Sequence, residues 1–208
     1  MNPIPGSVET FARLVGPEPD DIVAEMDAKA ETEGFPTVGP AVGGWLRLLA
    51  GLVDARRVFE FGSGFGYSAY WFAGALPEDG EVILTEVDAE ELAEARGFLE
   101  RGGYADRARF EHGDAIEIVE RYDGPFDCVL IDNEKDRYGE AFDGARGKVA
   151  EDGIVLADNA VSAGSIEFEA LSKLLSGVDV ETTDATRGIA DYLRTVRSEP
   201  AFETVLLP

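Results

Sequence analysis

From residue 57 onward, short apolar runs of strand character alternate with helical stretches, and this alternation constrains the fold most strongly. The strand-like runs are VFEF at 58–61, EVILTE at 81–86, RFEH at 109–112, FDCVLID at 126–132 and GIVLAD at 153–158. Between them, helical character is found near 66–76, 88–101, 114–121 and 136–149. Such alternation predicts a doubly wound α/β fold, a mostly parallel sheet with helices on both faces. Because crossovers are right-handed, the carboxyl ends of the strands meet at one edge, where ligands bind.

Two helices are predicted before this alternating region. Residues 18–34 favour an acidic helix that ends at a glycine. Residues 40–52 favour a second helix, in which apolar side chains recur at helical spacing, and we expect Trp45 of this helix to lie in the core.

The remainder of the chain continues this pattern. Residues 164–177 and 185–198 have helical character, and AFETVLLP at 201–208 is typical of one last strand. No repeat, linker or low-complexity tract interrupts the 208 residues. We therefore expect a single domain, with N-terminal helices over 1–52 and the α/β core over 53–208.

The chain is strongly acidic. It carries 18 Lys and Arg against 42 Asp and Glu, which gives a net charge of −24, and only four of the basic residues are lysines. Acids scattered over the surface predict a halophilic protein, because such a surface stays soluble in concentrated salt. The same field repels polyanions and argues against a general nucleic-acid or anionic-membrane binder, although a local basic patch could still bind RNA.

The cysteine content and the apolar stretches bear on the compartment. Cys128 is the single cysteine, so no intrachain disulfide can form, and its place in an apolar run predicts a core residue. The chain does not open on a signal-peptide pattern, and the longest mostly apolar stretch, 41–53, is broken by Arg47 and too short to cross a bilayer. These features predict a cytoplasmic protein.

A glycine-rich loop, EFGSGFG at 60–66, follows the first predicted strand and leads into a helix. Glycines at this position let the backbone approach a ligand closely. Glu60 would repel a pyrophosphate but suits a ligand with a cationic amino-acid end. Glu86 ends the next strand, where a carboxylate can accept hydrogen bonds from both ribose hydroxyls, and 113–115 would lie beside an adenine. Together these features favour S-adenosylmethionine over NAD.

Oxygen-bearing side chains end two further strands. Asp132 is the last residue of the fourth predicted strand and Asp158 the last of the fifth, with Asn159 directly after it. In a sheet of order 3-2-1-4-5 these strands are neighbours, and carboxylate and amide oxygens suit Mg²⁺ or another divalent ion such as Ca²⁺ or Mn²⁺. Either aspartate alone would more often be a helix cap or a solvated group. Lys135, three residues past Asp132, is a candidate proton acceptor because a lysine, unlike an arginine, can lose its proton.

Four segments resemble the metal-dependent O-methyltransferase family that includes catechol and caffeoyl-CoA O-methyltransferases. They are VFEFGSGFGYS at 58–68, AEARGFLERGGYADRARFEHGDA at 93–115, VLIDNEKDRY at 129–138 and GIVLADNAVSAG at 153–164. The resemblance implies a Rossmann-like class I methyltransferase fold, a metal held by Asp132, Asp158 and Asn159, and Lys135 as the proton acceptor.

The resemblance also implies that S-adenosylmethionine is lined by Glu60, Gly62, Gly64, Ser68, Glu86 and Ala115. To this predicted cofactor site we add five neighbours, Ser63, Tyr67, Val87, Asp114 and Asp132.

The sequence departs from the family pattern in two places. Ser162 stands where many members carry a tryptophan near the substrate, which weakens the expectation of an aromatic substrate wall. Family chains usually continue beyond a pair like Leu207-Pro208 into a glycine turn and an antiparallel strand, so we expect a closing hairpin strand to be missing.

By this resemblance, the expected activity is divalent-metal-dependent methyl transfer from S-adenosylmethionine to a hydroxyl of a small molecule. Acceptors with adjacent oxygens, such as catechols, would chelate the ion best. The helix at 40–52 and the N-terminal segment are candidates to cover either the substrate entrance or a partner in a homodimer.

Three other functions are less consistent with the sequence. A tRNA hydroxyuridine O-methyltransferase is disfavoured by the charge, although Arg137, Arg194 and Arg197 could form a local patch. An NAD-dependent oxidoreductase is disfavoured by Glu60 and the GxGxG spacing. A non-catalytic nucleoside-binding scaffold would need neither the predicted metal ligands nor Lys135.

Overall fold

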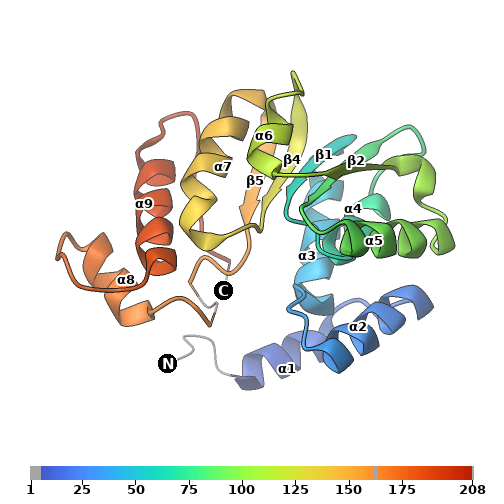
Figure 1. Ribbon diagram of the computed structural model, residues 1–208, viewed down its shortest axis with the longest axis horizontal. Coiled ribbons are helices and arrows are strands. Elements are labelled where there is room, and N and C mark those ends of the chain that lie inside the picture. Colours follow the sequence, from blue (N-terminus) through green and yellow to red (C-terminus); the bar gives the residue numbers. More distant parts are fainter. Residues whose placement is uncertain (1–5, 162–163, 208) are drawn as a thin grey trace.

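The computed structural model describes residues 6–161 and 164–207, and a five-stranded sheet forms its centre (Figure 1). The strands are β1 (Arg57–Phe61), β2 (Glu81–Glu86), β3 (Ala108–His112), β4 (Phe126–Ile131) and β5 (Val149–Ala157). They lie in the order β3-β2-β1-β4-β5, and every neighbouring pair is parallel. The doubly wound α/β fold and the strand order predicted from the sequence are confirmed.

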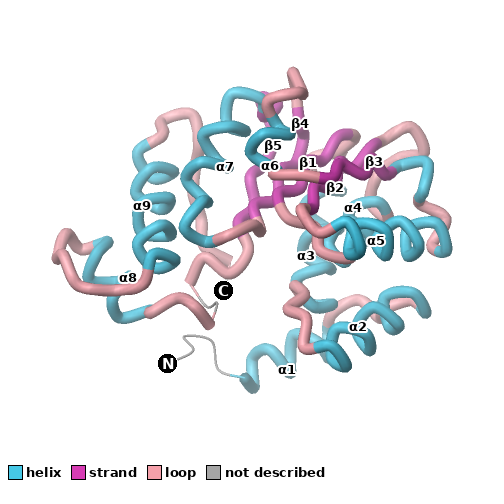
Figure 2. The backbone as a smooth tube through the Cα atoms, in the orientation of Figure 1, coloured by secondary structure: helices cyan, strands magenta, loops and turns pink. Residues whose placement is uncertain are grey.

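Helices cover both faces of the sheet (Figure 2). On one side of the sheet lie α2 (Asp21–Glu33), α3 (Gly39–Leu52), α4 (Tyr67–Ala73) and α5 (Ala89–Arg101). On the opposite side lie α6 (Ala115–Val119), α7 (Tyr138–Ala145), α8 (Phe168–Leu175) and α9 (Asp184–Ser198). The remaining elements are α1 (Gly6–Val15) and the short 3₁₀ helices η1 (Ala105–Arg107), η2 (Lys135–Arg137) and η3 (Arg146–Lys148).

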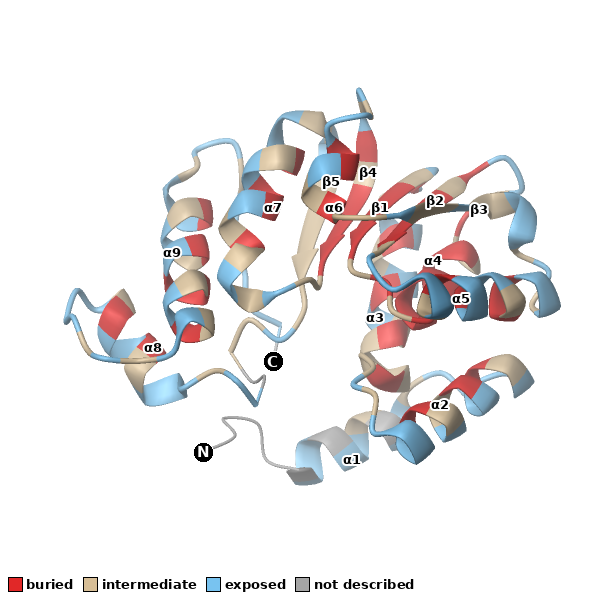
Figure 3. Ribbon diagram, viewed as in Figure 1, coloured by how far each residue is buried: buried red, intermediate tan, exposed pale blue. Residues whose placement is uncertain are grey.

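The two layers of helices explain the apolar runs of the strands. Successive strand residues point to opposite faces, so Val58 joins one hydrophobic cluster and Phe59 the other. With both faces covered, the central strands are buried almost throughout (Figure 3). Cys128 lies in the core, as predicted. Glu60 is the one charged residue of β1 that is fully buried. A carboxyl group in the core needs a compensating partner, which is described with the site below.

The N-terminal helices differ from the prediction in two respects. Helix α1, in the Pro- and Gly-rich opening, was not expected. The prediction that Trp45 lies in the core is wrong, because its side chain is 47% exposed. Helix α3 instead turns Gly43 and Leu46 inward, and a Cβ on Gly43 would lie only 2.3 Å from the Trp71 indole nitrogen. The helix therefore packs against the core through its Gly43 side, and the Trp45 side chain points toward solvent.

The C-terminal half also differs at its edges. Strand β5 begins at Val149, four residues earlier than predicted, because α7 ends at Ala145 and a register shift lets the longer strand pair with β4. The strand predicted at 201–208 is wrong: residues 202–207 have no regular structure, and Pro208 lies outside the described residues. A strand exists only when its backbone pairs in a ladder, and within the described ranges the segment pairs with no strand of the sheet. Along those same ranges no helix is both long and apolar enough to cross a membrane.

Candidate active site

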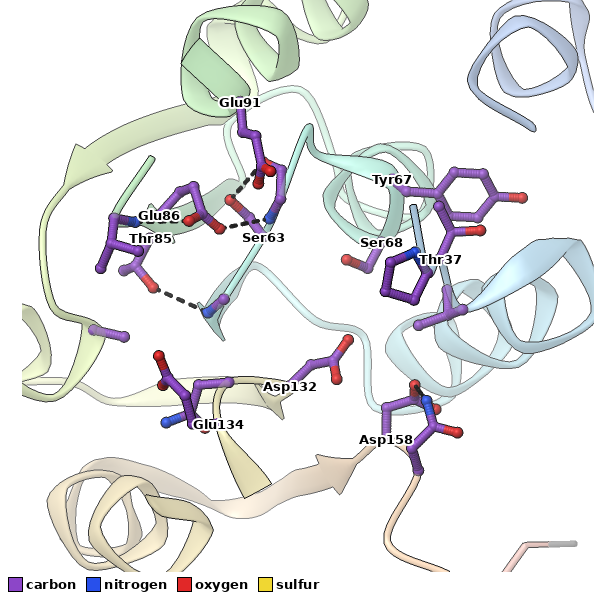
Figure 4. A pocket seen from close by; sticks show the side chains of 18 of the residues that line it. Thr37, Ser63, Tyr67, Ser68, Thr85, Glu86, Glu91, Asp132, Glu134 and Asp158 are labelled. Carbon is purple, nitrogen blue, oxygen red and sulfur yellow. Dashed lines mark hydrogen bonds between the residues drawn. The ribbon is translucent and has the colours of Figure 1, made fainter. Parts of the chain in front are cut away.

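A cavity of about 650 Å³ opens at the carboxyl ends of the strands, a size suited to a small-molecule ligand. All predicted site residues except Glu60 line it: Gly62, Ser63, Gly64, Tyr67, Ser68, Glu86, Val87, Asp114, Ala115, Asp132, Lys135, Asp158 and Asn159. In Figure 4, Asp132 and Asp158 lie near each other, while Glu86 and Glu91 gather in another part of the cavity. The parallel topology thus brings residues far apart in the sequence to one sheet edge.

The glycine loop is held in a conformation that only glycine adopts readily. Gly62 and Gly64 have φ angles of 80° and 49°. A Cβ on Gly62 would lie 2.8 Å from the Asp132 carbonyl oxygen, and one on Gly64 would lie 2.7 Å from the Phe35 ring. The loop needs glycines both for its backbone angles and for the close approach of its neighbours.

Glu86 fixes this loop against β2. Its Oε2 accepts a hydrogen bond from the Gly64 backbone nitrogen at 2.8 Å. Its Oε1 accepts from the backbone nitrogens of Val87 at 2.8 Å and Asp88 at 3.0 Å. A carboxylate has about four lone-pair positions, so these three bonds leave acceptor capacity at the edge of the cavity.

Glu60 lies beneath the cavity lining and is 0% exposed. The Ser68 hydroxyl, which does line the cavity, donates to Glu60 Oε1, whereas Oε2 is buried without a hydrogen-bond partner. Burial raises the pKa of the Glu60 carboxyl to about 8, against the opposing effect of the Ser68 hydrogen bond. An unpartnered buried carboxylate oxygen is costly, and this one would be satisfied by a cationic group. The residues present therefore fit the amino-acid end of S-adenosylmethionine.

A polar cluster joins the ends of β4 and β5. Lys135 Nζ donates to Asp132 Oδ1 at 3.0 Å, to the Tyr138 hydroxyl, and to the Asp158 backbone oxygen at 3.4 Å. Burial raises the pKa of both the Asp132 and the Asp158 carboxyl, and the Lys135 ammonium group opposes this effect. Two carboxylates that repel each other at the edge of a cavity are an arrangement that a cation would stabilise.

Asn159 completes the predicted metal-binding set. It has a left-handed backbone with φ 54°, which asparagine tolerates better than most residues. Its amide nitrogen donates to Asp158 Oδ2 at 2.6 Å, so the side chain is held against that carboxylate. Among the described residues no three His, Cys, Asp or Glu side chains gather as a metal site. The set consists of two carboxylates and one amide, a donor chemistry that fits a hard divalent ion.

The cavity also contains residues that were not predicted as site residues. Phe35, Thr37 and Val38 precede or begin the turn into α3, and Glu91 comes from α5. Arg137, proposed only as part of a basic patch, also lines the cavity, where it forms an ion pair of 2.9 Å with Asp114. Of these residues, only Arg137 lies within a segment that carries the family resemblance, 129–138. Ser162 lies outside the described residues.

The fold and the cavity together define a class I methyltransferase that uses S-adenosylmethionine. A model of the O-methyltransferase family matches residues 21–178, and the chain belongs to this family. It is an S-adenosylmethionine-dependent O-methyltransferase.

Individual relatives agree with this assignment. The chain is 36% identical to a catechol O-methyltransferase of Niastella koreensis over 159 residues, which cover 74% of this chain and 72% of the relative. It is 31% identical to a catechol O-methyltransferase of Mycobacterium tuberculosis over 174 residues, which cover 81% and 78%. The crystal structure of the O-methyltransferase TomG from Streptomyces achromogenes, in complex with S-adenosylmethionine, superimposes with a TM-score of 0.77 at 26% identity, covering 91% of this chain and 83% of TomG.

Proposed function

We propose that this protein is a divalent-metal-dependent O-methyltransferase whose acceptor is a small molecule with two adjacent oxygens, as in a catechol. The observation that carries the proposal is the approach of the Asp132 and Asp158 ends of two strands around Lys135, inside the cavity that contains the cofactor loop. The names of the two catechol O-methyltransferases to which the chain is similar support it.

In this proposal Asp132, Asp158 and Asn159 hold the metal, with Mg²⁺, Ca²⁺ or Mn²⁺ as candidates. When bound, the ion makes a substrate hydroxyl more acidic, and the cofactor provides a methyl group on a sulfonium sulfur. A hard divalent ion would take about six ligands, so these three side chains would leave about three positions for water or for two adjacent substrate oxygens. The cavity walls orient the acceptor oxygen toward the methyl group.

Lys135 takes the proton of the acceptor hydroxyl on Nζ, for which it must be in its neutral form. The acceptor oxygen forms a bond to the methyl carbon while the S–CH₃ bond breaks, and the electron pair of that bond stays on sulfur. The products are the methyl ether, S-adenosylhomocysteine and a protonated Lys135, which returns its proton to solvent.

The cofactor is assigned to the other end of the cavity. Glu86 binds the ribose hydroxyls with its remaining acceptor capacity, and Asp114 and Ala115 border the adenine. The pair of Ser68 and Glu60 receives the amino-acid end, where the unpartnered Glu60 Oε2 supports the assignment.

The charge of the cavity bears on the class of acceptor. Six acidic residues line it, Glu86, Glu91, Asp114, Asp132, Glu134 and Asp158, against Lys135 and Arg137. Both basic side chains are paired, Lys135 with Asp132 and Arg137 with Asp114 and Glu140. Arg194 is likewise bonded to Asp191 and to the Leu174 carbonyl oxygen. This charge distribution favours a neutral or cationic catechol over an anionic acyl thioester or tRNA.

The test is methyl transfer from labelled S-adenosylmethionine at high salt, with and without Mg²⁺. The acceptors are catechol, its isomer resorcinol, a hydroxylated acyl-CoA thioester and tRNA. We expect label in catechol only when Mg²⁺ is present. Resorcinol has the same composition but no adjacent oxygens, so it should react poorly. Equal transfer to catechol in excess EDTA would contradict the metal role, and preferential transfer to tRNA would favour the alternative.

A further inference from the structure

Tyr138 is the first residue of α7, and its side chain is fully buried although its hydroxyl reaches the polar cluster of the active site. The hydroxyl donates to the Asp158 backbone oxygen at 2.8 Å, and Asp132 Oδ1 lies farther away at 3.4 Å. A tyrosine hydroxyl has a single proton, which the shorter contact takes. Its lone pairs are then directed to the remaining donor, Lys135 Nζ, which donates to it.

The amino group of a lysine is not held in one position by its own side chain, because the four-carbon stem is flexible and the terminal group is a point charge without a fixed geometry. Contacts from other residues must therefore fix it. Here Nζ has three acceptors: a carboxylate of Asp132, a backbone oxygen of Asp158 and the Tyr138 hydroxyl. Only the hydroxyl acceptor lies outside the predicted metal-binding residues. Nζ also lies 4.6 Å from the centre of the Tyr138 ring, so the ring and the hydroxyl of one side chain both contact it.

The position of Tyr138 is itself fixed by α9. The Tyr138 ring packs edge-on against Tyr192, with centroids 5.6 Å apart and an interplanar angle of 88°. One turn earlier on α9, Gly188 touches the segment that carries Lys135: a Cβ there would lie 2.4 Å from the Asp136 Cα. Because α9 packs against both Tyr138 and Asp136, the segment 135–138 has little freedom to rearrange around Lys135 if the Tyr138 hydroxyl is removed.

We propose that Tyr138 is a positioning residue that holds Lys135 Nζ where it can receive the acceptor proton. The inference rests on the proposed role of Lys135 as proton acceptor. Tyr138 is not itself that acceptor, because its hydroxyl donates its single proton to the Asp158 backbone oxygen and accepts a hydrogen bond from Lys135 Nζ. Its function is to stop Nζ from collapsing onto the Asp132 carboxylate alone.

The test is a double-mutant cycle with Tyr138→Phe and Lys135→Ala, measured with whichever acceptor of the panel above reacts fastest. Lys135→Ala should lower kcat by about 10²- to 10⁴-fold, the usual contribution of a general base. Tyr138→Phe should lower kcat by about 10- to 100-fold, as expected for a misplaced catalytic group, with KM for S-adenosylmethionine changed less than twofold. In the Lys135→Ala background Tyr138→Phe should have no further effect, because its partner is gone.

Tyr192→Phe is the matched control. It removes a buried tyrosine hydroxyl from the same aromatic pair, leaves the ring packing in place, and should keep kcat within twofold of the wild type. An equal loss from Tyr138→Phe with and without Lys135 would overturn the inference, as would a normal kcat for Tyr138→Phe beside an impaired Lys135→Ala.

Failure of the proposed function gives a different result, namely full activity of Lys135→Ala or no methylation of any acceptor. In that case the crystal structure of Tyr138→Phe decides the inference by itself. Nζ should leave the Asp158 carbonyl oxygen in the variant, and an unchanged Nζ position would refute the positioning role.

Discussion

Replacing Glu60 with glutamine is expected to stabilise the protein at pH 8 while weakening its binding of S-adenosylmethionine. Glu60 is fully buried in β1, and one of its carboxylate oxygens has no partner. In the absence of cofactor, an ionised carboxylate at this position opposes folding. With the cofactor bound, the same charge is matched by the cationic amino-acid end.

The magnitude follows from the pKa of the Glu60 carboxyl, which burial raises from 4.5 to about 8. Between these two values the folded protein keeps a proton that the unfolded chain has lost, so the free energy of unfolding falls as the pH rises. The difference of 3.5 pKa units corresponds to about 5 kcal/mol at most, fully lost above pH 8. Glutamine cannot ionise, but it buries an unpaired N–H at a cost of about 1–3 kcal/mol. The net gain of Glu60→Gln at pH 8.5 is therefore about 2–4 kcal/mol.

The assay is urea denaturation of the cofactor-free protein at pH 5 and pH 8.5 in concentrated KCl, with calorimetric titration of S-adenosylmethionine at the same salt. Glu100→Gln, an exposed position on α5, is the control and should change neither quantity. Glu60→Gln should bind the cofactor about 10- to 100-fold more weakly, the effect of losing a hydrogen bond between charged groups. The reasoning is refuted if Glu60→Gln lowers the free energy of unfolding equally at both pH values, or if cofactor affinity is unchanged.

Three further predictions concern the metal, the glycine loop and the surface. Asp158→Ala should abolish Mg²⁺-dependent methyl transfer to catechol and leave cofactor affinity within threefold of the wild type, as measured by label transfer and calorimetry; unchanged turnover would count against the metal site. Gly64→Ala should destabilise the fold by more than about 1 kcal/mol in urea denaturation, because its φ is 49° and its Cβ would lie 2.7 Å from the Phe35 ring. Gly97→Ala, in α5 with open space around it, should instead stabilise by about 0.5–1 kcal/mol, and equal effects of the two would contradict the steric argument. The melting temperature should decrease when KCl is lowered from molar to millimolar concentration, because the acidic groups that give the net charge of −24 then repel one another without screening by salt. An unchanged melting temperature would contradict the halophilic interpretation.

The sheet and the residues at its strand ends could be predicted because their signals are local. Apolar runs such as 126–132 mark a strand covered on both faces, and the last residue of each run must lie at the carboxyl edge. Asp132, Glu86 and Asp158 could be placed at the same edge of the sheet in this way without any knowledge of helix packing. The glycine loop could be predicted from an equally local signal, because its glycines are required by the backbone angles of the loop itself.

Features that depend on how helices pack could not be predicted in this way. Apolar spacing in α3 allowed Trp45 to face inward, and only the close packing of Gly43 against Trp71 turns it outward. Phe35 and Glu91 reach the cavity because α2, α3 and α5 pack beside the loop, which no periodicity encodes. The contact between Tyr138 and Lys135 similarly requires α9 to brace the segment between them. The homodimer and the cytoplasmic location stay predictions from the sequence.

The central claim is that Asp132, Asp158 and Asn159 hold a divalent ion beside the cofactor. It is tested most directly by a crystal of the protein grown with S-adenosylhomocysteine and Mn²⁺, with diffraction recorded at the manganese absorption edge. The account predicts one anomalous peak about 2.2 Å from a side-chain oxygen of each of the three residues, a distance typical of a hard divalent ion. A cofactor-bound crystal with no peak among these three side chains, or with its peak elsewhere, would contradict the account.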